Sequence, residues 1–331
     1  MGQKILVTGG AGYIGATAVR LLLKHGHEVT ALDNLSQGHR EAVPDRARLV
    51  LTDLSNREAL GTLFRESKFD AVMHFAASAL VGESMQLPEK YFRNNVTNSL
   101  NLLECCAANK VSRFVFSSTA ATFGDPQTSL IDENSPKNPL NPYGESKLQV
   151  EAMLHWFQKI HGVRYAVLRF FNVAGAWDGH GEHHDPESHL IPIVLKVAQG
   201  KRESVSVFGS DYPTPDGTCV RDYVHIYDLA VAHLLVLDAL KERDALAYNL
   251  GNGNGFSVRE VIEASRKVTG RPIPTVESPR RPGDPPVLVA SSAKISKELG
   301  WKPRYDKLEE IIQTAWDWHQ KYPNGYEGKK E

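Results

Sequence analysis

Cysteine is scarce in this chain, and its few cysteines form no recognisable pattern. The 331 residues include only Cys105, Cys106 and Cys219, and no two of them make a Cys-x-x-Cys pair. A disulfide framework is therefore not expected. The simplest setting for such a chain is a reduced, cytoplasmic one.

The chain also has almost no net charge and no long apolar runs. The chain has 38 Lys and Arg against 39 Asp and Glu, and a formal net charge of -1. This balance does not suit a surface that coats nucleic acid or an anionic membrane, so neither partner is expected. No apolar segment is long enough to cross a bilayer, and no signal-peptide pattern opens the sequence. At 41% hydrophobic residues, the chain can bury a full core.

Several glycines near the start of the chain follow a predicted strand. Residues 4–8 form a short apolar run that predicts a buried parallel strand, and Gly9, Gly12 and Gly15 follow it. An amphipathic segment then continues to His25. A strand, a glycine turn and a helix are the context of a dinucleotide site, although the spacing is Gly-x-x-Gly-x-x-Gly rather than the common Gly-x-Gly-x-x-Gly. The alternative is an ordinary turn between a strand and a helix.

Acidic and amide side chains follow the next two predicted strands. Asp33 and Asn34 end the second strand, where a carboxylate can accept hydrogen bonds from both adenosine ribose hydroxyls and repel a 2′-phosphate. This favours NAD over NADP, and the alternative is that Asp33 only opens a turn. Asp53, beside Leu54 after the third strand, suits either an adenine contact or a helix N-cap.

The fourth and fifth predicted strands end in small and hydroxylated residues. Residues 71–75 end in Ala76 and Ala77, which leave room for a cofactor across the strand end, and His74 lies in an apolar run as a core histidine. Residues 114–119 change from apolar to hydroxylated. We therefore expect Thr119 to hydrogen-bond a reacting hydroxyl or carbonyl, or otherwise to cap a turn.

One turn of a predicted helix separates Tyr143 from Lys147. Residues four apart share a helix face, so a phenol and an ammonium emerge side by side. A nearby positive charge favours the phenolate, and we expect Lys147 to lower the pKa of Tyr143 toward use as a base. Taken alone, the pattern also fits a surface Tyr and a solvated Lys on one face by chance.

After residue 170 the strand and helix alternation breaks down. Together these patterns predict an α/β fold: a Rossmann-type doubly wound parallel sheet over residues 1–172, to which some later segments return, and a smaller mixed α/β lobe over 173–331 that binds substrate. Two basic points, residues 220–223 and 280–284, suggest arginines for a second phosphate-bearing ligand, or else surface salt bridges.

A histidine-rich loop precedes residue 190. His180, His183, His184 and His189 could ligate a metal, but their spacing fits no recognised template. We expect a solvated loop and no metal.

With these residues assembled, the chain resembles the extended short-chain dehydrogenases/reductases, and within them the family of UDP-glucose 4-epimerases. The motifs that carry the resemblance lie at residues 8–15, 33–35, 81–84, 116–120, 142–147, 169–176, 211–218, 220–225, 248–251 and 281–284. Their order and spacing cover essentially the whole chain.

The resemblance implies a retained NAD and the interconversion of UDP-galactose and UDP-glucose through a transient 4-keto sugar, as in galactose metabolism. Tyr143 would remove the proton of the 4-hydroxyl, Thr119 would bond the same oxygen, and Lys147 would hold the nicotinamide ribose. The implied cofactor-binding residues are Gly9, Gly12, Tyr13, Ile14, Gly15, Asp33, Asn34, Asp53, Leu54, Phe75, Ala76, Ala77, Asn94, Ser117, Tyr143, Lys147 and Phe171. The implied substrate-binding residues are Thr119, Tyr143, Asn172, His189, Leu190, Ser206, Phe208, Arg221, Arg281 and Asp284.

The resemblance also implies a homodimer that pairs two helices per subunit, at residues 88–109 and 143–161. Three positions depart from the family pattern: Ala79 stands where many members have Lys, Ser188-His189-Leu190 replaces Asn-Asn-Leu, and Leu288 replaces a bulky Tyr at the gate for N-acetylated sugars. Acceptance of N-acetylated UDP-sugars is therefore open.

Three other functions deserve comparison. A 4,6-dehydratase needs acidic residues after the Thr, whereas Ala120 and Ala121 have nothing to titrate. Another UDP-sugar 4-epimerase, for example one acting on a pentose, and a non-catalytic NAD-sensing protein both stay open as alternatives.

Overall fold

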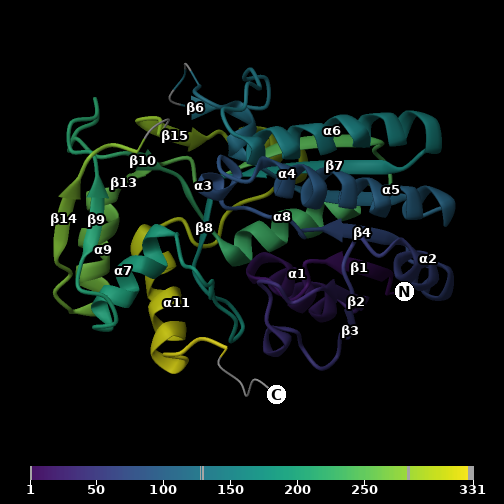
Figure 1. Cartoon of the computed structure of the whole chain (residues 1–331), viewed down its shortest axis with the longest axis horizontal. Coiled ribbons are helices and arrows are strands. Elements are labelled where there is room, and N and C mark those ends of the chain that lie inside the picture. Colours follow the sequence, from purple (N-terminus) through teal and green to yellow (C-terminus); the bar gives the residue numbers. More distant parts are fainter. Residues whose placement is uncertain (1, 127, 129, 282–283, 327–331) are drawn as a thin grey trace.

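Seven parallel strands form the larger sheet of the protein (Figure 1). The structure is a computed structural model, and it describes residues 2–126, 128, 130–281 and 284–326. The strand order is β12-β7-β5-β4-β1-β2-β3. The strands are β1 (Lys4–Thr8), β2 (Glu28–Asp33), β3 (Arg48–Leu51), β4 (Ala71–His74), β5 (Arg113–Thr119), β7 (Arg164–Phe170) and β12 (Ala245–Leu250).

Helices cover both faces of this sheet, and the alternation along the strands explains why. In β1, Ile5 and Val7 pack on one face while Leu6 packs on the other, and all three are fully buried. The first face is covered by α1 (Tyr13–Lys24), α8 (Ile226–Ala239) and α10 (Ala293–Leu299), and the second by α2 (Arg57–Ser67), α5 (Asn98–Ala108) and α6 (Pro142–His161).

The order of the strands reverses beside β1, and this reversal locates the binding crevice. From β1 the chain first builds outward through β2 and β3, and then continues on the other side of β1 with β4, β5 and β7. Ligands of open parallel sheets bind at the carboxyl ends of the strands at such a point. The glycine turn after β1 and the small residues after β4 both lie there.

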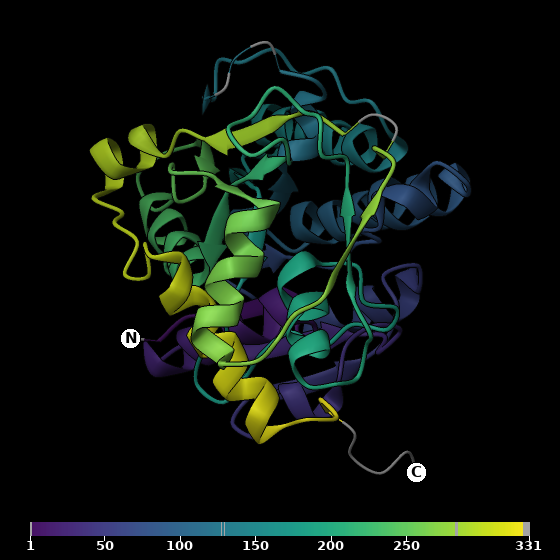
Figure 2. The ribbon, with the colours of Figure 1, turned by 90° about the vertical axis from the view of Figure 1, so that its left-hand side faces the viewer.

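A second group of elements packs beside the carboxyl edge of the large sheet (Figures 1 and 2). Its helices are α7 (Leu190–Ala198), α9 (Val258–Thr269) and α11 (Leu308–Lys321), which share a buried cluster. Its strands form three small sheets: β13-β10-β15-β6, β11-β8 and β14-β9. They are β6 (Leu130–Ile131), β8 (Asn172–Ala174), β9 (Val205–Phe208), β10 (Val220–Arg221), β11 (Tyr223–His225), β13 (Phe256–Ser257), β14 (Thr275–Ser278) and β15 (Val287–Ala290).

Short helices complete the described chain. They are the 3-10 helices η1 (Arg40–Ala42) and η3 (Ala120–Phe123), the α-helical turns α3 (Val81–Ser84) and α4 (Pro88–Tyr91), and the π-helix η2 (Phe92–Thr97). The helix expected over residues 88–109 is thus continuous but contains a π segment. No helix in the described ranges combines the length and apolarity needed to cross a bilayer.

The predicted fold class is confirmed. The large sheet gains one strand that the sequence pattern did not assign, because β12 pairs with β7 after a long excursion of the chain. Residues after 172 therefore contribute to both groups of elements, and the division at 172 stays a prediction. Within the basic stretch 280–284, Pro282 and Gly283 lie outside the described residues.

Candidate active site

The turn between β1 and α1 is shaped so closely that glycine is required at two positions. A Cβ at Gly9 would lie 2.7 Å from the Ala76 nitrogen, and a Cβ at Gly15 would lie 2.0 Å from the Gly9 carbonyl oxygen. Gly12 is the N-cap of α1, and it offers no side chain to the first backbone N–H groups of the helix. Such free N–H groups suit a pyrophosphate. Tyr13, Ile14 and Gly15 form the first turn of the helix behind them.

Asp33 lies at the end of β2 with both carboxylate oxygens held by backbone. It accepts hydrogen bonds from the Ala11 nitrogen at 3.0 Å and the Leu35 nitrogen at 2.8 Å. Burial raises the pKa of Asp33, while these N–H donors oppose that effect. Asn34 donates to Asp53 at 2.6 Å, so the expected adenosine residues Asn34, Asp53 and the adjacent Leu54 lie together. The N-cap alternative for Asp53 is wrong, because Asn56 caps α2.

The loop after β4 is held by the π segment. Ser78 receives a hydrogen bond from the Asn94 amide at 3.1 Å, and its backbone nitrogen donates to Asn95 at 2.8 Å. Asn95 also donates to Ser146 of α6 at 3.0 Å. The partly exposed residues 75–77 are thereby fixed beside the glycine turn. Sequence reasoning named Asn94 but missed Asn95, whose role depends on the extra residue of the π turn.

His74 is a core residue, as the sequence predicted. Its two ring nitrogens lie 2.6 Å from the Thr8 hydroxyl and 2.8 Å from the Ser99 hydroxyl. Burial, with a smaller effect of Lys147, lowers the pKa of His74 to about 3. It is therefore neutral and performs no proton transfer near neutral pH.

Tyr143 lies in the first turn of α6, opposite the end of β5. Asn141 caps this helix by accepting from the Gly144 nitrogen at 2.8 Å, and Pro142 opens it. A Cβ at Gly144 would lie 2.4 Å from the Ala121 carbonyl oxygen, so glycine lets the helix approach η3. The Thr119 hydroxyl accepts from the Ala121 nitrogen at 3.1 Å and so caps η3, which was the alternative role predicted for it. The same side chain lies near enough to Tyr143 to lower the pKa of its phenol, so the two predicted residues are neighbours.

The electrostatics of Tyr143 differ from the sequence-based expectation. Burial raises the pKa of Tyr143 above its ordinary value of 10.0, and the nearby Thr119 side chain lowers it by a smaller amount. Lys147 is 4% exposed, and its ammonium donates to the Ser117 carbonyl oxygen at 3.0 Å. Burial lowers the pKa of Lys147 to about 7, against a smaller opposite effect of Glu151. Lys147 therefore does not lower the pKa of Tyr143 in the protein alone.

A buried ion pair that the sequence did not reveal supports this end of the sheet. Arg169 donates to both oxygens of Glu151 at 2.9 and 2.6 Å, and Ser118 donates to the same carboxylate at 2.6 Å. The two charged side chains are 5% and 9% exposed. The pair joins β7 to α6 and so fixes the rotation of the helix that carries Tyr143.

Most of the predicted substrate residues lie in the second group of elements. Arg221 and Asp284 form an ion pair, and the Arg281 guanidinium stacks 4.0 Å above the ring of Phe208. Leu288 is directly opposite Arg221 in the pairing of β15 with β10. The arginines and the gate position are therefore neighbours.

Other predicted residues have different surroundings. Asn172 is the first residue of β8, directly after Phe171, and its backbone nitrogen donates to the Asp222 carbonyl oxygen at 3.0 Å. Ser206 lies on β9. His189 and Leu190 open α7, but the His189 ring contacts Glu182 and Glu187 at 2.9 Å each. Glu182 above all raises the pKa of His189. Sequence reasoning missed both glutamates.

The fold and this crevice define a dinucleotide-binding protein of the short-chain dehydrogenase/reductase type, with a Tyr and Lys pair one helical turn apart. A family model described as "NAD dependent epimerase/dehydratase family" matches residues 5–251. The chain belongs to this family.

The similarity to individual relatives extends over nearly the whole chain. A UDP-glucose 4-epimerase of Halalkalibacterium halodurans is 51% identical over 325 residues, which are 97% of this chain and 97% of that protein. A crystal structure of a UDP-glucose 4-epimerase matches with a TM-score of 0.96 at 51% identity, covering 98% of this chain and 100% of the other. The enzyme of Bifidobacterium longum in complex with NAD+ and UDP matches with a TM-score of 0.93 at 37% identity, covering 97% and 99%.

Proposed function

We propose that this protein is an NAD-dependent isomerase that interconverts UDP-galactose and UDP-glucose at C4. The observation that carries the proposal is the position of Tyr143 near Thr119 at the carboxyl edge of the sheet that also carries the glycine turn. Relatives that are named UDP-glucose 4-epimerase, and are 51% identical to this chain over nearly its full length, support the choice of substrate.

The residues of the crevice fit NAD. The cradle formed by Gly9 and Gly15 has no room for a Cβ, and the uncapped start of α1 offers N–H donors to a pyrophosphate. The Asp33 carboxylate at the end of β2 suits the ribose hydroxyls. When bound, NAD supplies a reversible two-electron oxidation of the sugar at C4.

The chain's own side chains handle the proton and the oxygen. Tyr143 takes the proton of the 4-hydroxyl and returns it to the same oxygen, while Thr119 donates a hydrogen bond to that oxygen. Lys147, buried against Ser117, holds the cofactor ribose. Asn172, Leu190, Ser206, Phe208, Arg221, Arg281 and Asp284 bind the nucleotide sugar, with the arginines on the diphosphate.

In the described state Arg221 is paired with Asp284. A diphosphate that binds Arg221 must therefore compete with this carboxylate or share the guanidinium with it. We infer that Asp284 orients Arg221 before substrate arrives, because a paired guanidinium loses less side-chain freedom on binding.

The experiment follows each sugar with and without added NAD. Purified protein is incubated with UDP-galactose and separately with UDP-N-acetylgalactosamine, and the C4 epimers are measured. We expect UDP-glucose from UDP-galactose in both conditions. Conversion only with added NAD would mean weak cofactor retention, which Ala79 would explain.

Two outcomes would replace the proposal. If neither sugar is converted but a UDP-pentose is, the protein is another UDP-sugar 4-epimerase. If NAD binds and none of these sugars turns over, the NAD-sensing alternative holds. Epimerisation of the N-acetylated sugar would show that Leu288 leaves the gate open.

We further propose a cytoplasmic homodimer formed through α5 and α6. The three cysteines are free, in keeping with a reducing compartment. On α6, Trp156 is 58% and Ile160 is 69% exposed, and residues four apart share one face of the helix. Large exposed apolar side chains on one face mark an interaction surface.

A further inference from the structure

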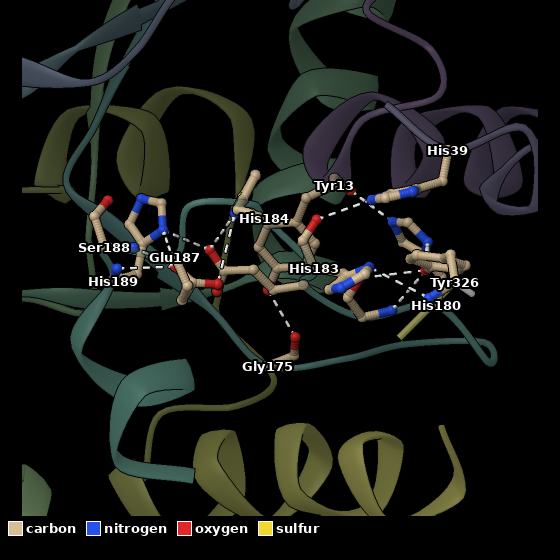
Figure 3. Close-up of polar contacts among 12 residues, drawn as sticks. Tyr13, His39, Gly175, His180, His183, His184, Glu187, Ser188, His189 and Tyr326 are labelled. Carbon is tan, nitrogen blue, oxygen red and sulfur yellow. Dashed lines mark hydrogen bonds and ion pairs between the residues drawn. The ribbon is translucent and has the colours of Figure 1, made fainter. Parts of the chain in front are cut away.

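The loop before α7 gathers four side chains of the kinds that bind metal ions. Three of them belong to neither predicted binding set, and the fourth, His189, was predicted to contact substrate but here contacts two glutamates. Glu182, His184, Glu187 and His189 each offer one ligand atom, and the four atoms lie within 4.8 Å of one another. Figure 3 shows His184, Glu187 and His189 turned toward one another at the start of α7, with Tyr13 beside them. We propose that these four residues bind one divalent transition-metal ion, with Zn2+ the best fit.

The separations of the ligand atoms scatter around those of a tetrahedral site, and the largest is no more than 4.8 Å. His189 Nδ1 lies 2.9 Å from Glu182 Oε1 and 2.9 Å from Glu187 Oε1, and His184 Nδ1 lies 3.2 Å from Glu182 Oε1. His184 Nδ1 is 3.9 Å from Glu187 Oε2. Four ligands bound tetrahedrally at about 2.0–2.2 Å from zinc are roughly 3.3–3.6 Å apart. Small movements therefore suffice to admit the ion.

The charges in the cluster need a cation. The side chains of Glu182 and Glu187 are only 6% and 4% exposed. Their ion-pair partners within the described chain are His184 and His189 alone, with no Lys or Arg among them. Two buried carboxylates are costly unless a positive charge is near, because buried charges must be paired or bound to metal.

The hydrogen bonds of the two histidines point to the same conclusion. A single Nδ1 of His189 faces two carboxylates, although one N–H can align with only one acceptor. The buried Nδ1 of His184 has no hydrogen-bond partner of acceptable geometry in the described residues. Both nitrogens thus face the carboxylate oxygens with which they would share a metal ion.

Surrounding contacts preset the ligands. Glu187 Oε1 accepts from the backbone nitrogens of Ser188 and His189, each at 2.9 Å, which leaves Oε2 toward His184. The His184 ring stands edge-on to Tyr13, with centroids 6.3 Å apart. The His189 side chain is 48% exposed, so an ion can enter from solvent.

The donor set selects among metals. Two imidazole nitrogens and two carboxylate oxygens suit zinc and its neighbours, whereas calcium and magnesium favour oxygen alone. The ion would tie the loop to the start of α7. All four ligands lie within residues 182–189, so the ion would stabilise this loop itself. Tyr13 ties the same loop to α1 separately, by donating to the Gly175 carbonyl oxygen at 2.6 Å.

The test compares ligand variants with matched neighbours. Tag-free full-length protein is stripped with a chelator, titrated with Zn2+ against a chromophoric competitor, and its metal content is measured by mass spectrometry. We expect one Zn2+ per chain. Glu182→Gln and His184→Asn should weaken binding at least tenfold, while Asp185→Asn and His183→Asn, which alter the same loop outside the four ligands, should not.

A second readout keeps the proposal testable if the ligand variants do not fold. Co2+ bound to the wild-type chain should show the intense visible absorption of four-coordinate cobalt, and Zn2+ should raise the midpoint of thermal unfolding. Failure of the wild-type chain to bind stoichiometric Zn2+, or undiminished binding by both ligand variants, would overturn the site. The first of these outcomes would mean that protonated histidines neutralise the glutamates.

Discussion

Tyr143 is protonated at neutral pH in the protein alone, because burial raises its pKa above 10.0 and Thr119 offsets this only in part. A base must lose that proton, so the crevice has to gain positive charge near the phenol when its ligands bind. Lys147, with a pKa of about 7, carries only part of a charge near neutrality. Proton transfer thus depends on the loaded site rather than on the Tyr and Lys pair by itself.

Removing the Tyr143 hydroxyl tests this role directly. Tyr143→Phe should lower kcat for UDP-galactose by about 10²–10⁴-fold, the usual contribution of a positioned acid or base. The matched control is Tyr165→Phe, since Tyr165 lies on β7 and belongs to neither predicted binding set. Equal kcat for Tyr143→Phe and wild type would remove Tyr143 from the chemistry.

The burial of Lys147 predicts a pH dependence of stability. Between the folded pKa of about 7 and the ordinary value of 10.5, the unfolded chain binds the proton and the folded chain has lost it. Stability therefore rises with pH in this window through Lys147, by at most about 1.4 kcal/mol per pH unit, and the penalty is full below pH 7. Lys147→Met should be more stable than wild type at pH 7, with a smaller advantage at pH 9.

Urea unfolding of both proteins at several pH values measures this difference. Groups shared by the two chains cancel, so the difference reports Lys147. An advantage for Lys147→Met that is constant from pH 7 to 9 would contradict the lowered pKa.

At the scale of elements, the junction of β1 and α1 depends on backbone contact rather than on side chains. Gly15 is in the first turn of α1, and its missing Cβ is what lets the helix lie against the Gly9 carbonyl. The π segment η2 plays a comparable role for the loop after β4, because it directs Asn94 and Asn95 to Ser78. Both features align the carboxyl ends of neighbouring strands.

Gly15→Ala should therefore harm the fold and the cofactor site together. Its Cβ would meet backbone at 2.0 Å, which cannot be relieved by a side-chain rotation. We expect a loss of stability of about 1–3 kcal/mol and weaker NAD binding, measured by thermal unfolding with and without NAD.

Gly61→Ala is the opposite control. Gly61 lies inside α2, where a Cβ would meet only the end of the Arg65 side chain at 3.2 Å. It should stabilise the protein by about 0.5–1 kcal/mol. A Gly15→Ala variant as stable as Gly61→Ala would show that the turn has more room than the structure gives.

At the scale of the molecule, the exposed face of α6 predicts association. Trp156→Asp combined with Ile160→Asp places two charges on this face, and we expect the dimer to dissociate at least tenfold more readily because buried charge lacks partners. Sedimentation velocity measures this. Val276→Asp is a matched control. Val276 is also apolar and 53% exposed, but it lies on β14 in the second group of elements and not on α6.

The control should keep the wild-type mass. A wild-type chain that sediments as a monomer would contradict the proposed dimer. A double variant that stays dimeric would move the interface away from the face of Trp156 and Ile160.

The sequence by itself determined the features whose physics is local. A run of apolar residues followed by Gly9, Gly12 and Gly15 predicts a strand and a tight turn into a helix. A spacing of four residues places Tyr143 and Lys147 on one helix face. The alternation of short apolar runs with helical segments predicted the doubly wound sheet, because a parallel strand that buries both faces is a continuous apolar run.

Only the tertiary structure decided features that depend on burial and on contacts across the chain. The pKa of Lys147 depends on how completely β5 and α6 cover it. Strand β12 joins the sheet through pairing with β7, which is remote in sequence. The cluster of Glu182 and Glu187 with two histidines was invisible to a search for histidine spacing, because a loop without regular period brings the four together. Spacing predicts geometry only within a regular element, so contacts made by loops and between elements required the folded chain.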